Sequence, residues 1–265
     1  MTPMRRARGN LGFTLVELLV ALGIISVLIT LVVSLSSSFL GYSRHSNVIN
    51  TAIADLNDVT GYLATNARRA LRGIGCQNRP GTAGNPNDPP VSCGTESSIS
   101  ITYDGSTFVC STTSADGSCI ALVVPVVDRS TLTSDITGFE LLAYRVIPIS
   151  DWDGDPGVSR GWNGEETPLM LEYRATLGCG TTCGVPPPNP SAVTASIESL
   201  VATDLFLEDE LGGAYLPFRL VTDPLSTDLK LQSATFRLRL RGSGLEQSTV
   251  MPSNNVLSVT ATSRP

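Results

Sequence analysis

Apolar residues are densest near the start of this chain, where they form one continuous stretch. From Gly9 to Leu35 the stretch holds a single charged residue, Glu17, and it is long enough to cross a membrane as a helix. A carboxylate near the membrane centre costs on the order of 2.5 to 3.5 kcal/mol on insertion scales, so Glu17 should have a partner. We therefore predict a transmembrane helix over residues 13–35.

After this stretch the apolar residues thin out but keep a helical spacing. They recur every three or four positions, at Ile49, Ala52, Ile53, Leu56, Val59, Leu63, Ala67, Ala70, Leu71 and Ile74. This spacing predicts that the helix continues through residues 36–75 with one apolar face, which packs on a globular domain. Gly73 and Gly75 provide the expected C-terminal stop.

Residues 76–265 have the pattern of a β-rich domain. The segment 77–97 is polar and rich in turn-forming residues, and strand candidates follow it. They lie at residues 98–103, 107–110, 120–127, 139–147, 169–177, 218–222, 231–241 and 256–262. Residues 196–210 fit a helix or a strand equally well. The expected fold is α+β, in which the long N-terminal helix packs on antiparallel strands.

The charges predict how the chain is oriented in a membrane. Residues 1–12 form a basic leader with three arginines and no acidic residue, which the positive-inside rule keeps in the cytoplasm. The chain has 18 basic and 24 acidic residues, and without the three leader arginines 15 face 24, a net charge of −9. This acidic balance argues against nonspecific binding of the exported part to nucleic acid or anionic lipid.

The motif at residues 12–17, GFTLVE, resembles the type IV pilin and pseudopilin family. The resemblance implies that a prepilin peptidase cleaves between Gly12 and Phe13, that the new N-terminus at Phe13 is methylated, and that Glu17 serves assembly. The physics supports the last role independently. An ammonium at Phe13 would need a carboxylate from a neighbouring subunit, and Glu17 is the one available in the span. A secretory signal peptide fits less well, because the apolar run is too long.

The family resemblance also implies a location and partners. The chain would be a single-pass inner-membrane protein with its N-terminus inside, and later part of a periplasmic or cell-surface filament. Its partners would be the peptidase, other pilins or pseudopilins and an inner-membrane assembly platform. Segments 60–75 and 135–265 loosely resemble the larger minor pilins and the J-type minor pseudopilins of type II secretion. Pilus, type II secretion and DNA uptake all remain open.

An alternative function is a tip subunit that binds DNA or a surface. In the segment 236–241 three arginines, Arg237, Arg239 and Arg241, alternate with apolar residues, so we expect them on one face of a strand. Such a face could contact phosphates, although a solvated sheet face is the better explanation of the pattern.

The six cysteines all lie beyond the apolar helix, on the side expected to be exported. An even number of exported cysteines predicts disulfides. The simplest scheme joins sequence neighbours, as Cys76–Cys93, Cys110–Cys119 and Cys179–Cys183. Half of a zinc site at the last pair is the alternative, but no second such pair or histidine cluster accompanies it.

An acidic loop offers a candidate calcium site. Asp151, Asp153 and Asp155 alternate in a glycine-containing segment, although Pro156 stands where an EF-hand loop has glycine. A solvated acidic turn is the other interpretation. No enzyme is expected, because the one serine-elbow pattern, at Ser159, lies far in sequence from the single histidine, His45.

Overall fold

The computed structural model describes residues 14–75, 98–111, 119–128, 136–152, 167–179, 183, 190–207, 217–222, 231–242, 249–251 and 257–262. The chain divides into two compact units, Met1–Asn47 and Val48–Pro265. Helix α1 (Leu15–Arg69) begins in the first unit and ends in the second. The two units are described separately below.

The described part of the first unit is helical from Leu15 onward. Between Leu15 and Leu40 every large hydrophobic side chain is half or more exposed, so this part of α1 buries none of its apolar surface in the protein. By length and composition, the segment Leu15–Leu40 is able to cross a membrane. An all-round apolar helix is typical of a lipid environment.

In the second unit, α1 ends at Arg69 and the chain enters strand β1 (Arg72–Gly75). The prediction of a helix to residue 75 is therefore wrong for its last residues. Their backbone pairs with β4 instead, and a Cβ on Gly73 would lie 3.1 Å from the side chain of Leu231. Strand pairing and this close approach override the helical spacing of Leu71 and Ile74.

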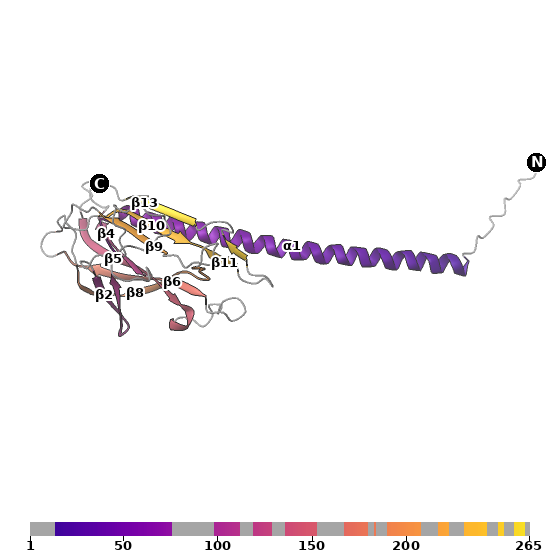
Figure 1. Cartoon of the computed structure of the whole chain (residues 1–265), viewed down its shortest axis with the longest axis horizontal. Coiled ribbons are helices and arrows are strands. Elements are labelled where there is room, and N and C mark those ends of the chain that lie inside the picture. The colour runs from indigo at the N-terminus through magenta and orange to yellow at the C-terminus, as the bar shows by residue number, and fades with distance from the viewer. Residues whose placement is uncertain are drawn as a thin grey trace, which may run out of the picture. The chain divides into compact units, whose positions relative to one another are not determined.

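The largest sheet contains five antiparallel strands in the order β1-β4-β5-β6-β8. Beside β1 it comprises β4 (Cys119–Val127), β5 (Ile136–Pro148), β6 (Pro168–Leu177) and β8 (Ile197–Ala202). Figure 1 shows β4, β5 and β6 side by side. The segment that fitted helix or strand equally thus begins with a strand.

Both faces of this central sheet are buried. Alternate residues of β5 point to opposite sides, as the strand period of two requires: Leu142 and Tyr144 join one core and Leu141 and Ala143 the other. The first core contains the buried face of α1, including Leu63, and residues of β9, β10 and β13. The α+β fold with a helix packed on antiparallel strands is confirmed.

Three smaller sheets complete the described structure. One has the order β13-β10-β9, from β9 (Phe218–Thr222), β10 (Leu231–Leu238) and β13 (Leu257–Thr262). A second has the order β3-β2-β7, from β2 (Ser98–Tyr103), β3 (Ser106–Ser111) and β7 (Ala192–Thr194), in which β2 and β7 are parallel. A third pairs β11 (Leu240–Gly242) with β12 (Thr249–Met251).

The β2–β3 hairpin turns at Asp104-Gly105, where both residues have positive φ. An Asp-Gly pair is a preferred sequence for such a tight turn. Cys110 lies in β3, the second strand of this hairpin, and is bonded to Cys119 at the start of β4. The disulfide thus links the small sheet to the central one.

Candidate functional site

Helix α1 begins with a reciprocal pair of hydrogen bonds between Thr14 and Glu17. The backbone N–H of Thr14 donates to Oε2 of Glu17 at 3.0 Å, and the backbone N–H of Glu17 donates to the Thr14 hydroxyl at 3.3 Å. The Thr14 hydroxyl also donates to the same carboxylate at 2.9 Å. This is a capping box, which satisfies N–H groups that the first helical turn would leave unpaired.

Four hydroxyl side chains of the apolar segment form hydrogen bonds within the helix. Ser26 donates to the carbonyl of Gly23, Thr30 to that of Ser26, and Ser37 and Ser38 both to that of Ser34. Such bonds let hydroxyl groups lie in lipid.

Glu17 differs from these hydroxyls because it carries a charge. It forms no ion pair with any residue that the structure describes, and Thr14 provides hydrogen bonds but no positive charge. A carboxylate in an apolar span without a counter-charge marks a functional site in membrane proteins. No residue that the structure describes therefore provides a positive charge for Glu17.

A second polar cluster joins α1 to the central sheet in the second unit. Glu172 on β6 is fully buried, and its carboxylate accepts hydrogen bonds from the Tyr62 hydroxyl at 2.6 Å and from Nε of Arg174. A guanidinium N–H of Arg174 also donates to the Tyr62 hydroxyl at 2.7 Å. Nearby, Asn66 donates to the hydroxyl of Tyr144 at 2.8 Å.

The two tyrosines of this cluster are held in their neutral form. Burial raises the pKa of Tyr62, and the hydrogen bond and charge of Glu172 raise it further. Burial and Glu172 likewise raise the pKa of Tyr144. Both hydroxyls therefore stay protonated at neutral pH and act as hydrogen-bond donors and acceptors. The cluster neutralises a buried charge and fixes α1 on the sheet, which is a structural role.

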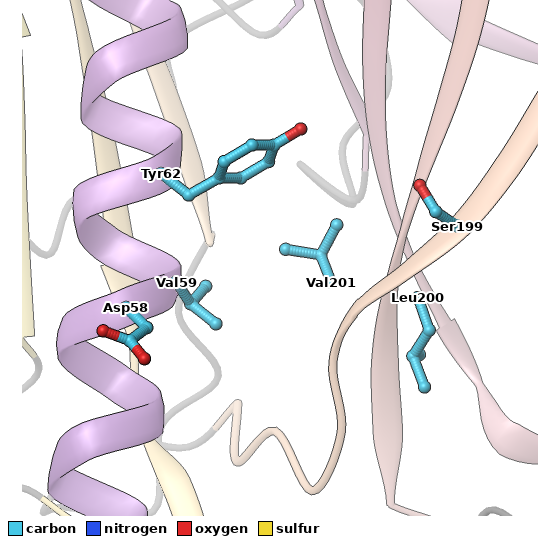
Figure 2. Close-up of a pocket in the computed structure, with 6 residues that line it drawn as sticks. All are labelled: Asp58, Val59, Tyr62, Ser199, Leu200 and Val201. Carbon is cyan, nitrogen blue, oxygen red and sulfur yellow. The ribbon is translucent and has the colours of Figure 1, made fainter.

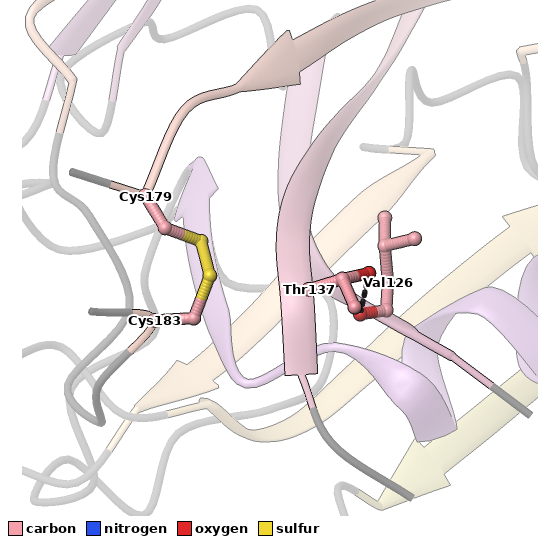
Figure 3. Close-up of a disulfide and its surroundings, with 4 residues drawn as sticks. All are labelled: Val126, Thr137, Cys179 and Cys183. Atoms are coloured by element: carbon pink, nitrogen blue, oxygen red, sulfur yellow. Dashed lines mark hydrogen bonds between the residues drawn. A yellow bond between two sulfur atoms is a disulfide. The ribbon is translucent and has the colours of Figure 1, made fainter. Parts of the chain in front are cut away.

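The structure contains two of the three disulfides in the neighbour scheme, Cys110–Cys119 and Cys179–Cys183. Figure 3 shows the second, together with the Thr137 hydroxyl that donates to the carbonyl of Val126, where β4 and β5 shift register. No cysteine among the described residues is free. The proposed partners Cys76 and Cys93 lie outside the described residues.

Several other predicted site residues also lie outside the described part of the chain. They are Gly12, Phe13, Asp153, Asp155, Ser159 and the side chain of His45. Asp151 is described and is exposed, in the short 3-10 turn Ile149–Asp151. The described residues contain no group of three metal-binding side chains, so the calcium site remains a prediction.

The predicted arginine face does not form. Strand β10 ends at Leu238, and Arg239 is only 4% exposed, with its guanidinium 5.4 Å from the ring centroid of Phe206. The backbone N–H of Phe206 also donates to the carbonyl of Arg239. The segment with Phe206 lies against Arg239 and buries this central arginine of the three. The expectation of one solvated arginine face was therefore wrong.

Comparison with known proteins bears on the N-terminal segment. Residues 7–33 match the prokaryotic N-terminal methylation motif. The chain is type IV pilin-like. The motif implies processing by a prepilin peptidase and assembly with other pilins, and the apolar helix fits the membrane anchor of a pilin precursor. No curated protein and no solved structure matches this pilin-like chain significantly.

Two features of these sites were not predicted. The capping role of Thr14 has a sequence signal, a threonine three residues before a glutamate at the start of an apolar run. The contact between Tyr62 and Glu172 spans 110 residues and has no local signal.

Proposed function

We propose that this chain is a minor type IV pilin or pseudopilin, a structural subunit without enzymatic activity. The N-terminal helix holds it in the inner membrane, with the leader inside and the acidic β-rich unit outside. After the peptidase removes residues 1–12, an assembly platform extracts the subunit into a pilus or pilus-like filament. The principal supporting observation is Glu17, a carboxylate in an apolar helix with no described counter-charge.

Cleavage after Gly12 explains why this carboxylate is needed. The new ammonium group at Phe13 would enter the filament at the edge of an apolar helix, where an unpaired charge is costly. Glu17 of a neighbouring subunit neutralises it. The capping box with Thr14 fixes the first helical turn, so the carboxylate is presented in a defined position before the partner arrives.

Three variants separate assembly from helix capping. Glu17→Gln keeps an oxygen that can accept the Thr14 N–H bond but removes the charge, Glu17→Val removes both, and Thr14→Val removes only the capping hydroxyl. All three should insert in the membrane. We expect the two Glu17 variants to be missing from sheared filaments and the Thr14 variant to be present. Recovery of Glu17→Gln in filaments at the unmutated level would show that the charge is not the assembly partner.

A further inference from the structure

A shallow groove of about 270 Å³ lies between α1 and β8 in the second unit. Its lining residues are Asp58, Val59, Tyr62, Ser199, Leu200 and Val201. Figure 2 shows Val59 and Tyr62 reaching from the helix toward Val201 on the strand. The floor is therefore mainly apolar, and Asp58 is the one charged residue of the lining.

The strand side of the groove is an edge of the central sheet. Strand β8 comes last in the strand order, and among the described residues its backbone pairs only with β6. This pairing is regular from Ile197 to Leu200, and a bulge at Val201 follows. An edge strand presents backbone N–H and C=O groups that can pair with another chain. The edge beside the groove therefore offers main-chain hydrogen bonds to an extended segment.

Apolar side chains are exposed along this edge. Ile197 is 50% exposed, and Tyr62 and Leu200 are each 37% exposed. Ile197 and Ser199 are two residues apart on β8, so both face the side of the sheet on which the groove lies. Exposed apolar residues that gather in one place mark interaction sites, whereas single scattered ones are ordinary. Ile197 thus extends the apolar surface of the groove along the strand.

The charges at this edge favour a basic ligand. Asp58 is exposed on α1 at the groove, and Glu198 lies on β8. None of the described cations forms an ion pair with either carboxylate. Arg174 on the neighbouring strand β6 is instead paired with Glu172 and Glu140. A positively charged side chain from another molecule would therefore complement the groove.

We propose that the groove binds an extended segment of a partner protein, which adds to β8 as a sixth strand of the central sheet. An apolar side chain of the segment packs over Val59 and Val201. A basic side chain two residues away, on the same face, reaches Asp58 and covers apolar surface with its aliphatic stem. In this mode of recognition, main-chain hydrogen bonds provide affinity and alternate side chains provide specificity. The inference needs only the second unit and does not depend on the proposed function.

Binding of synthetic peptides to the full chain in detergent tests this proposal. The probe is a fluorescently labelled peptide, Thr-Val-Thr-Lys-Thr-Val-Thr, in which the valines and the lysine share one face of a strand. One control peptide has glutamate in place of lysine, and the other has proline in place of the third and fifth residues, which prevents strand pairing. Fluorescence anisotropy should show saturable binding of the lysine peptide, binding about tenfold weaker for the glutamate peptide, and none for the proline peptide. No saturable binding of the lysine peptide, or equal binding of either control peptide, would overturn the inference.

Variants of the chain test whether the peptide lies in the groove. Asp58→Lys should weaken binding of the lysine peptide about tenfold and make the glutamate peptide the tighter ligand, and Ile197→Lys should weaken binding of both. Ile53→Lys is the matched control, because Ile53 is 43% exposed on α1 and lies outside the groove lining. All three positions are exposed, so the variants should fold, and their melting curves check this. An Asp58→Lys variant that prefers the lysine peptide, or an equal loss of binding in Ile53→Lys, would overturn the inference.

Discussion

Removing the Tyr62 hydroxyl should destabilise the second unit measurably. Tyr62→Phe deletes the donor to the buried Glu172 at 2.6 Å and the acceptor for Arg174 at 2.7 Å, and leaves the ring in place. Hydrogen bonds to charged groups contribute about 1.5 to 3 kcal/mol each. Tyr62 is 37% exposed, so water replaces part of the loss, and Arg174 still pairs with Glu172. We expect the free energy of unfolding to fall by about 1.5 to 3 kcal/mol in total.

Urea unfolding of the chain from Val48 onward, which is the compact second unit, measures this change. Tyr103→Phe is the matched control, because among the described residues its ring has contacts but its hydroxyl has no hydrogen bond, and it should change stability by less than about 0.5 kcal/mol. In a Glu172→Gln background, Tyr62→Phe should cost less than it does alone, since the two groups interact directly. An effect of Tyr62→Phe no larger than that of the control would refute the structural role of this cluster.

Four further predictions concern pH, disulfides, processing and calcium. Burial chiefly raises the pKa of Tyr62, Tyr144 and Tyr173, so folding favours their protonated forms. The stability that these tyrosines provide is complete below about pH 10 and should fall above it. Urea unfolding midpoints measured between about pH 8 and about pH 10.5 will show this fall. Replacing Cys110 and Cys119 by alanine should lower the free energy of unfolding by about 2 to 5 kcal/mol in the same assay, and an unchanged midpoint would count against a stabilising bridge. Gly12→Trp should block maturation, so that the mass of the membrane-bound protein retains the leader. If the acidic loop binds calcium, a chelator should lower the melting temperature of the second unit but leave that of the Asp153→Ala variant unchanged. Equal melting curves of the unmutated protein with and without calcium would indicate an ordinary turn.

The long helix and most strands were predictable because their signals are local. The strand predicted over 218–222 has the bounds found in the structure, and the Asp-Gly turn lies between two predicted strands. The end of α1 was mispredicted for a nonlocal reason. The spacing of Leu71 and Ile74 continues the helical pattern, but the backbone of Arg72–Gly75 pairs with β4, more than 40 residues further along the chain.

The candidate sites likewise divide into those with a local sequence signal and those that depend on nonlocal contacts. Glu17 was conspicuous because one charge in an apolar span has a known cost, and Thr14, which hydrogen-bonds to it, carries the local signal of a capping box. The burial of Arg239 depends on where Phe206 meets the chain between β10 and β11, and the groove that Asp58 lines between α1 and β8 depends on a bulge opposite Leu171. Neither depends on a local pattern, so sequence periodicity alone could not have predicted them.

Mass spectrometry of sheared filaments from cells that make the unmutated chain tests the central claim most directly. The proposal of a processed filament subunit predicts that the chain is present and that its N-terminal peptide begins at a methylated Phe13. Finding the chain only in the membrane fraction, or in filaments with residues 1–12 still attached, would contradict it.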